Sequence, residues 1–243
     1  MRRARAVLCF VGAVGICFPD LLSGGPPVIL LPNPAFDRAV SSRWLSMARV
    51  LITAFAPYDE WRENASWLAL VRLTSELPDQ PQITTRRYPV DFAAMRQMVA
   101  RDLETPYDVV LHLGQAPGSA ALHLETFGLN IAGMSNERPE EYRPLAADGP
   151  AAYRSGLPLA KWAKWLRAAG VPAQVSHHAG TYLCNATLYW SHHIIEQRGL
   201  PTKAGFIHIP LDVSQSVAHA RELPSLATEV VVKGLQLILA ECA

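Results

Sequence analysis

Hydrophobic positions along the chain follow two alternating patterns, one typical of buried strands and one typical of amphipathic helices. Short apolar runs rich in β-branched residues predict strands, and apolar residues that recur every three or four positions predict helices. The predicted strands span residues 49–55, 82–90, 107–114, 119–133, 171–180 and 203–210. The predicted helices span residues 64–77, 91–104, 157–170, 181–199 and 225–243.

This order of elements predicts a single α/β domain. Strands that alternate with helices favour a three-layer α/β/α sandwich around a mixed, mostly parallel central sheet. The polar, proline-rich stretch 134–156 predicts a loop. In open sheets of this kind, sites form at the carboxyl ends of the strands. We therefore expect the loops after residues 55, 113, 180 and 209 to lie close together.

Residues 1–46 do not follow this pattern. A basic start precedes the apolar stretch AVLCFVGAVGICF, and Gly-Gly-Pro-Pro follows. The stretch is shorter than the ~20 residues that cross a bilayer, and no clear small-x-small cleavage site follows it, although its order is that of a signal peptide. Three interpretations stay open: a signal segment, a disordered extension, and translation that begins at Met47. We favour the last and predict one catalytic domain over residues 47–243.

Composition and charge exclude several classes of function. Hydrophobic residues make up 50% of the chain and charged residues 18%, which is typical of a soluble globular protein and not of a disordered one. The formal net charge is +1, without a basic stripe or a run of like charges. We therefore expect neither nucleic acid nor an acidic membrane surface as a partner. Self-association into a homo-oligomer is left open.

The four cysteines are scattered along the chain, at Cys9, Cys17, Cys184 and Cys242. They form neither a disulfide framework nor the paired Cys-x-x-Cys spacing of a zinc site. The cytoplasm is therefore the expected compartment, with export as the alternative if residues 1–46 act as a signal. In a reducing compartment a lone mid-chain Cys184 is a candidate nucleophile. The other interpretation is a buried core thiol, which is common for free cysteine.

Cys184 falls in the first turn of the helix predicted over residues 181–199. The partial positive charge and unpaired N–H groups of a helix N-terminus stabilise a thiolate, and the same groups can hold an oxyanion. His208, in GFIHIP, lies near the carboxyl end of a predicted strand and is either a base for this thiol or a satisfied core histidine. Glu125, within the apolar run LHLETFG, either orients His208 or points to solvent.

Together these segments resemble pyroglutamyl-peptidase I, a family of cysteine peptidases that remove an N-terminal pyroglutamate. AGTYLCN is similar to the family's nucleophile motif, GFIHIP to its histidine motif, and HLGQA with LETFGLN to its glutamate segment. The similarity extends from about Arg49 to the end of the chain. It implies that Cys184 is the nucleophile, that His208 is the general base and then acid, and that Glu125 orients His208. It also implies that the enzyme uses no metal and no organic cofactor.

The resemblance further implies a pocket for the flat, neutral lactam ring, built from aromatic faces and a few hydrogen bonds. Phe55 and Tyr58 stand where the family has two pocket phenylalanines, and Gln115 stands in the loop that lines the lactam site. Tyr182 occupies the aromatic position two before the nucleophile. Asn64 matches the asparagine that steadies the first loop.

Three departures from the family pattern concern this pocket. Asp59-Glu60 replaces the usual Gly-Gly, which makes positive φ angles harder to adopt, Ser119 replaces an arginine, and Ser135 falls near another missing arginine. They leave three hypotheses. The leading one is a peptidase for small peptides with N-terminal pyroglutamate. The alternatives are a thiol amidase for another small acyl or lactam substrate, and a non-catalytic binding protein on the same scaffold.

Overall fold

The computed structural model describes residues 8–11, 14–17, 28–30, 47–134 and 137–243, in two compact units, Met1–Met47 and Ala48–Ala243. In the first unit, the strands β1 (Leu8–Val11), β2 (Val14–Cys17) and β3 (Val28–Leu30) form an antiparallel sheet in that order. The rest of residues 1–46 lies outside the described residues, so the interpretations of this segment stay predictions. No helix in the described part of the chain has the length and apolar character needed to cross a bilayer.

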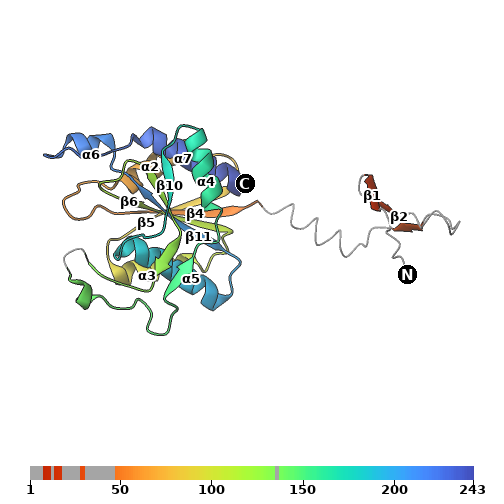
Figure 1. Ribbon diagram of the computed structural model, residues 1–243, viewed down its shortest axis with the longest axis horizontal. Helices are drawn as coiled ribbons and strands as arrows, with labels where there is room; N and C mark the ends of the chain where they lie inside the picture. Colours follow the sequence, from red (N-terminus) through yellow and green to blue (C-terminus); the bar gives the residue numbers. More distant parts are fainter. Residues whose placement is uncertain (1–7, 12–13, 18–27, 31–46, 135–136) are drawn as a thin grey trace, which may run out of the picture. The chain divides into compact units, whose positions relative to one another are not determined.

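The second unit is built on a six-stranded sheet with the strand order β10-β7-β11-β6-β4-β5. Helices cover both faces of this sheet, so the unit is the expected three-layer α/β/α sandwich (Figure 1). The strands are β4 (Arg49–Phe55), β5 (Gln82–Tyr88), β6 (Val109–Gln115), β7 (Leu122–Glu125), β10 (Ala173–Ser176) and β11 (Lys203–Ile209).

The two helix layers enclose two separate hydrophobic clusters. One layer holds α2 (Ala65–Thr74), α4 (Leu159–Ala168) and α7 (Thr228–Cys242), and the other holds α3 (Phe92–Asp102) and α5 (Leu183–Arg198) (Figure 1). Alternate residues of each central strand point into opposite clusters, as Leu51 and Ile52 do on β4. Burial on both faces explains why these strands are continuous apolar runs.

The sheet is mixed at one junction only among the described strands, which confirms the predicted class. β4, β5, β6 and β11 are mutually parallel, and β10 is parallel to β7, but β7 runs antiparallel to β11. The loop after β10 therefore leaves in the opposite direction to the loops after β4, β6 and β11, contrary to the simple parallel expectation.

Two predicted segments contain different elements in the structure, for a non-local reason. The strand predicted over residues 119–133 breaks at Thr126 into β7 and β8 (Phe127–Leu129). The predicted loop 134–156 contains a 3-10 turn, η1 (Pro139–Glu141), and β9 (Ala152–Arg154), which pairs with β8 outside the main sheet. A three-residue polar strand carries no periodic signal of its own, since its partner strand determines its pairing.

Candidate active site

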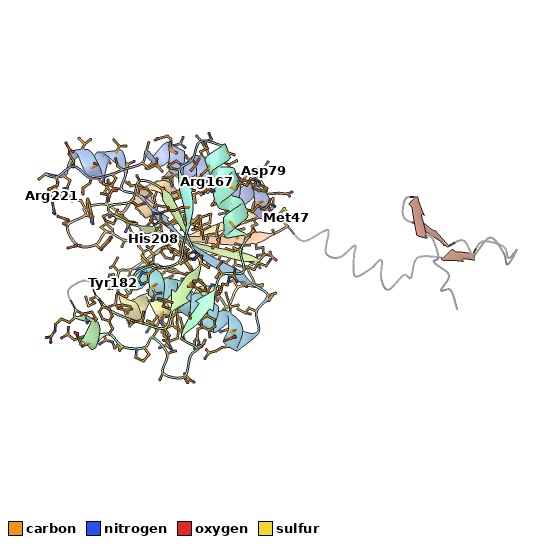
Figure 2. The ribbon with its side chains drawn as sticks, in the orientation of Figure 1. Met47, Asp79, Arg167, Tyr182, His208 and Arg221 are labelled. Atoms are coloured by element: carbon orange, nitrogen blue, oxygen red, sulfur yellow. The ribbon has the colours of Figure 1, made fainter. Side chains whose placement is uncertain are left out.

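A pocket of about 900 Å³ opens where the central strands end. Its wall brings together the loops after β4 and β6 and the segment that leads into α5, as the sequence predicts, whereas β11 contributes His208 and not the loop that follows it. Figure 2 shows His208 near the middle of the second unit, between the helix layers, with Tyr182 on the side of α3 and α5. The predicted site residues that line this pocket are Phe55, Tyr58, Asn64, Gln115, Tyr182, Cys184 and His208.

Glu125 lies behind His208 and is the one predicted site residue that does not line the pocket among the described residues. It ends β7 and is completely buried, and its Oε1 accepts a hydrogen bond from His208 Nδ1 at 2.8 Å. β7 runs antiparallel to β11, and Glu125 is the register partner of Phe206, two positions before His208. The antiparallel junction of the sheet therefore carries the carboxylate to the face on which His208 lies.

Cys184 is the second residue of α5, whose N-cap is Tyr182. The N–H groups in the first turn of a helix have no acceptor within the helix, and Leu183 and Cys184, the first two residues of α5, both line the pocket. The helix start is fixed by Asn185, whose Oδ1 accepts from Leu129 N at 2.7 Å and whose Nδ2 donates to Leu129 O at 3.0 Å. Sequence reasoning did not identify Asn185, although it lies next to the nucleophile in the motif.

The charge state of His208 follows from its two neighbours. Burial alone would lower the pKa of its imidazole, but the negative charge of a Cys184 thiolate and the contacts with Cys184 and Glu125 outweigh burial. They raise the pKa of His208 from 6.5 to about 10. A protonated imidazole between a carboxylate and a cysteine side chain is an arrangement that can support nucleophilic catalysis.

Gly114 makes room for this arrangement beneath the thiol. A Cβ at this position would lie 2.5 Å from the ring of Phe206 and 2.9 Å from Cys184 Sγ. Phe206 is fully buried and its ring centroid is 4.8 Å from that of His208. Gly114, near the end of the apolar strand β6, therefore allows the backbone to approach the nucleophile closely.

Aromatic residues form the apolar part of the pocket. Phe55 ends β4 and is buried against Phe206, with ring centroids 6.3 Å apart. Tyr182 is half-buried and packs edge-on against Phe92 at 5.3 Å. Burial and the nearby Cys184 raise the pKa of Tyr58 to about 12, so its phenol is a neutral hydroxyl near pH 7.

Asn64 and Gln115 tie the first loop to the sheet. Asn64 caps α2, where its Oδ1 accepts from Ser66 N at 3.0 Å, and its Nδ2 donates to Ala56 O at 3.1 Å. Gln115, the last residue of β6, accepts a hydrogen bond from Ala65 N at 2.7 Å. These bonds fix the loop that follows Phe55 at both of its ends.

The loop after β4 contains a residue with a positive φ angle, although Asp59-Glu60 stands where the family has Gly-Gly. Asp59 adopts a φ of 54°, in the left-handed region, although the sequence offers no glycine there. Aspartate tolerates this region better than most residues, at a cost of about 1 kcal/mol. Asp59 and Glu60 both line the pocket and make its rim acidic. Ser135, another of the three departures, lies outside the described residues.

The described residues contain no cluster of three or more His, Cys, Asp or Glu side chains with the geometry to hold a metal ion. Cys242, the other cysteine of the second unit, is half-buried on α7, and burial raises the pKa of its thiol to about 11. It does not line the pocket, so it serves as an internal control for Cys184.

Comparison with known proteins places this chain in a family. The family model for pyroglutamyl peptidase matches residues 48–243. The pyrrolidone-carboxylate peptidase of Thermococcus onnurineus is 37% identical over 196 residues, which cover 79% of this chain and 96% of that protein. Pyrrolidone-carboxylate peptidase 1 of Ralstonia nicotianae is 38% identical over 199 residues, covering 79% of this chain and 92% of that protein.

Solved structures give the same answer for the fold. The crystal structure of pyrrolidone carboxyl peptidase from Fervidobacterium islandicum AW-1 superposes with a TM-score of 0.74 at 30% identity, covering 79% of this chain and 96% of that one. The enzyme from Thermococcus litoralis superposes with a TM-score of 0.73 at 29% identity, covering 81% and 93%. The chain belongs to the pyroglutamyl peptidase family of cysteine peptidases.

Proposed function

We propose that this protein hydrolyses the amide bond after an N-terminal pyroglutamyl residue of small peptides, with Cys184 as nucleophile, His208 as general base and acid, and Glu125 as the residue that orients His208. The observation that carries the proposal is the hydrogen bond between His208 and the buried Glu125, with His208 and Cys184 both lining the pocket. Family membership supplies the substrate class.

The first half of the reaction forms an acyl-enzyme. The Cys184 thiolate attacks the pyroglutamyl carbonyl carbon, a C–S bond forms, and the carbonyl oxygen takes the negative charge. The N–H groups in the first turn of α5 stabilise this oxyanion. As the intermediate collapses, the C–N bond breaks and His208 gives its proton to the leaving amine. The shortened peptide departs with a free amino terminus.

The second half returns the enzyme to its starting state. A water molecule attacks the thioester while neutral His208 removes its proton, and the C–S bond then breaks. Free pyroglutamate is released and the thiolate again lies beside an imidazolium. Glu125 keeps Nδ1 of His208 protonated throughout, so that Nε2 performs both proton transfers. The residues named here supply every proton transfer.

The test compares wild type with Cys184→Ala on a pyroglutamyl-linked fluorogenic amide. We expect hydrolysis to fall by at least about 10⁴-fold, because removing a nucleophile leaves only binding and oxyanion stabilisation. Cys242→Ala is the matched control and should retain wild-type activity. Equal rates for wild type and Cys184→Ala would contradict the proposal.

The second candidate is a thiol amidase for another small acyl or lactam group. The Tyr58 hydroxyl and the acidic rim at Asp59 and Glu60 favour it, since both alter the polarity of the pocket. Turnover of pyroglutamyl amides compared with prolyl and simple acyl amides separates the two. The third hypothesis, a non-catalytic protein, predicts that the three groups do not converge, and the 2.8 Å contact between Glu125 and His208 disfavours it.

The domain bounds, the compartment and the oligomeric state are also part of this proposal. We assign catalysis to residues 47–243 as one domain and the protein to the cytoplasm, because the scattered cysteines suit a reducing compartment. Fluorescence microscopy of the tagged full-length chain, and N-terminal sequencing of the protein from its native cells, test the compartment and the start at Met47. Self-association stays a prediction that sedimentation tests.

A further inference from the structure

Gln215 lies in the short helix α6 (Val213–Val217), outside every motif described above, and it is nearly buried. Its Oε1 accepts a hydrogen bond from Asp212 N at 2.9 Å, and its Nε2 donates to Glu63 O at 3.0 Å. A backbone N–H can only donate and a backbone carbonyl can only accept. These two contacts therefore fix which end of the Gln215 amide is oxygen and which is nitrogen.

The orientation of the Gln215 amide in turn determines which end of the Gln115 amide is oxygen and which is nitrogen. Gln215 Nε2 also donates to Gln115 Oε1 at 2.9 Å, and Ala65 N donates to the same oxygen at 2.7 Å. Two donors directed at one atom require that atom to be the acceptor. The other end of the Gln115 amide is therefore Nε2, a donor.

The Nε2 donor of Gln115 is part of a side chain that lines the pocket. Gln115 lines the pocket and is only 4% exposed, and its buried Nε2 has no hydrogen-bond partner within the described residues. The phenol of Tyr58 lies beside the amide without forming a hydrogen bond of good geometry to it. A buried N–H without an acceptor is unfavourable, so a ligand that brings an acceptor to this point gains affinity.

We propose that Gln215 is a positioning residue that sets ring specificity, because it holds the Gln115 amide with its N–H donor toward the ring site. The inference rests on the proposed function and explains how the pocket selects one class of ring. A ring that carries a carbonyl oxygen supplies the acceptor, whereas a saturated, cationic ring presents only donors and methylene groups. The site then selects lactam acyl groups over prolyl-type rings.

The test uses two ligands that differ by the ring carbonyl, 2-pyrrolidone and pyrrolidine. Their affinities are measured by how well they protect Cys184 from iodoacetamide, which does not depend on turnover. In Gln215→Glu the carboxylate accepts only, so the Gln115 amide turns to donate to it and presents Oε1 to the ring. We expect the Kd of 2-pyrrolidone to rise by about tenfold, the effect of one lost hydrogen bond, while the Kd of pyrrolidine stays constant or falls.

Two further variants separate positioning from a structural effect. Gln215→Met keeps the length of the side chain without polar atoms, and Ala65 N still holds Gln115, so we expect the Kd of 2-pyrrolidone to rise by only about threefold. Gln97→Glu makes the same chemical change at an exposed position of α3 and should leave both ligands unaffected.

Weaker binding of 2-pyrrolidone with unchanged or tighter binding of pyrrolidine in Gln215→Glu supports the proposal, because a general distortion of the pocket would weaken both. Parallel weakening, or no change in either, overturns it. So does a wild-type protein that 2-pyrrolidone does not protect. Failure of wild type to hydrolyse a pyroglutamyl amide, with protection intact, would instead contradict the proposed function alone.

Discussion

Two buried histidines on neighbouring strands of this protein have opposite charge states. His112 on β6 is completely buried between hydroxyls, with Thr53 Oγ1 at 2.7 Å from Nδ1 and Ser191 Oγ at 2.8 Å from Nε2. His208 on the adjacent β11 contacts a carboxylate and lies beside a thiol. Burial lowers the pKa of His112 to about 3, whereas the partners of His208 raise its pKa to about 10.

The difference shows that the partners, and not burial, decide whether a histidine in this sheet can do chemistry. Both rings lose water, which by itself disfavours the imidazolium. Hydroxyls satisfy the hydrogen bonds of His112 without supplying charge, so it stays neutral and structural. The predictions below change the surroundings of His208, and then His112 and its partner, from the largest expected effect to the smallest.

Replacing the carboxylate should have the largest effect. In Glu125→Gln the imidazolium of His208 loses its charged partner, and we expect kcat/KM to fall by about 10²–10⁴-fold. The pKa of His208 should also fall, which moves the alkaline limb of the pH–rate profile to lower pH. Steady-state kinetics across pH measures both effects, with Glu104→Gln, an exposed residue just beyond α3, as the control. An unshifted alkaline limb would contradict the role of Glu125.

Crowding the thiol should have the next largest effect. Gly114→Ala places a methyl group against Phe206 and Cys184 Sγ. We expect a destabilisation of about 1–3 kcal/mol, the usual cost of overpacking, and a fall of at least about tenfold in kcat/KM, because the sulfur moves relative to the imidazole. Gly156→Ala is the control, since a Cβ there meets nothing within 4 Å. Full activity in Gly114→Ala would show that the sulfur position is not constrained.

His112 should control acid stability instead of activity. Its pKa is depressed in the folded state, so the unfolded chain binds a proton that the native protein does not. The stability that it contributes is present above pH 6.5 and lost as pH falls from 6.5 toward about 3. We expect up to about 1.4 kcal/mol of lost stability per pH unit in that window, and a shallower slope in His112→Gln.

Urea unfolding of wild type and His112→Gln at several pH values measures this slope. Some slope should remain in the variant, because burial also lowers the pKa of His192 to about 4. Identical slopes in the two proteins would mean that His112 is not neutral in the folded state. For His208 the sign is opposite: its contribution is present below pH 6.5 and declines as pH rises toward about 10.

Thr53→Val should have the smallest effect. It removes the hydroxyl next to His112 Nδ1 while keeping the shape of the side chain. We expect a loss of about 1–2 kcal/mol in the free energy of unfolding, because a buried ring nitrogen loses its partner, with kcat/KM unchanged. Chemical denaturation together with the fluorogenic assay checks both. A large loss of activity would mean that the His112 region takes part in catalysis after all.

Local patterns were sufficient for much of the fold. The run 49–55 matches β4, and the helices predicted from residues 64 and 91 begin at Ala65 and Phe92, directly after the caps Asn64 and Asp91. The antiparallel direction of β7 and the pairing of β9 depend on contacts distant in sequence, which no local period encodes. These are the elements that the pattern missed or assigned differently.

Part of the candidate site could also be predicted from local sequence, and part of it could not. Cys184, His208 and Glu125 stand out in sequence because each is a reactive group in an apolar or turn context. The orientation of the Gln115 amide could not be predicted, because it depends on Gln215, which lies 100 residues further along the chain. Hydrogen-bond direction is a property of the folded network and not of either residue alone.

The most direct test of the catalytic assignment is labelling with pyroglutamyl chloromethyl ketone followed by peptide mapping. The reagent carries the expected ring and alkylates the nucleophile that attacks its carbonyl group. We predict modification of Cys184 in proportion to lost activity, none on Cys242, and protection by 2-pyrrolidone. Inactivation with the label on another residue, or continued turnover with Cys184 fully modified, would contradict the account.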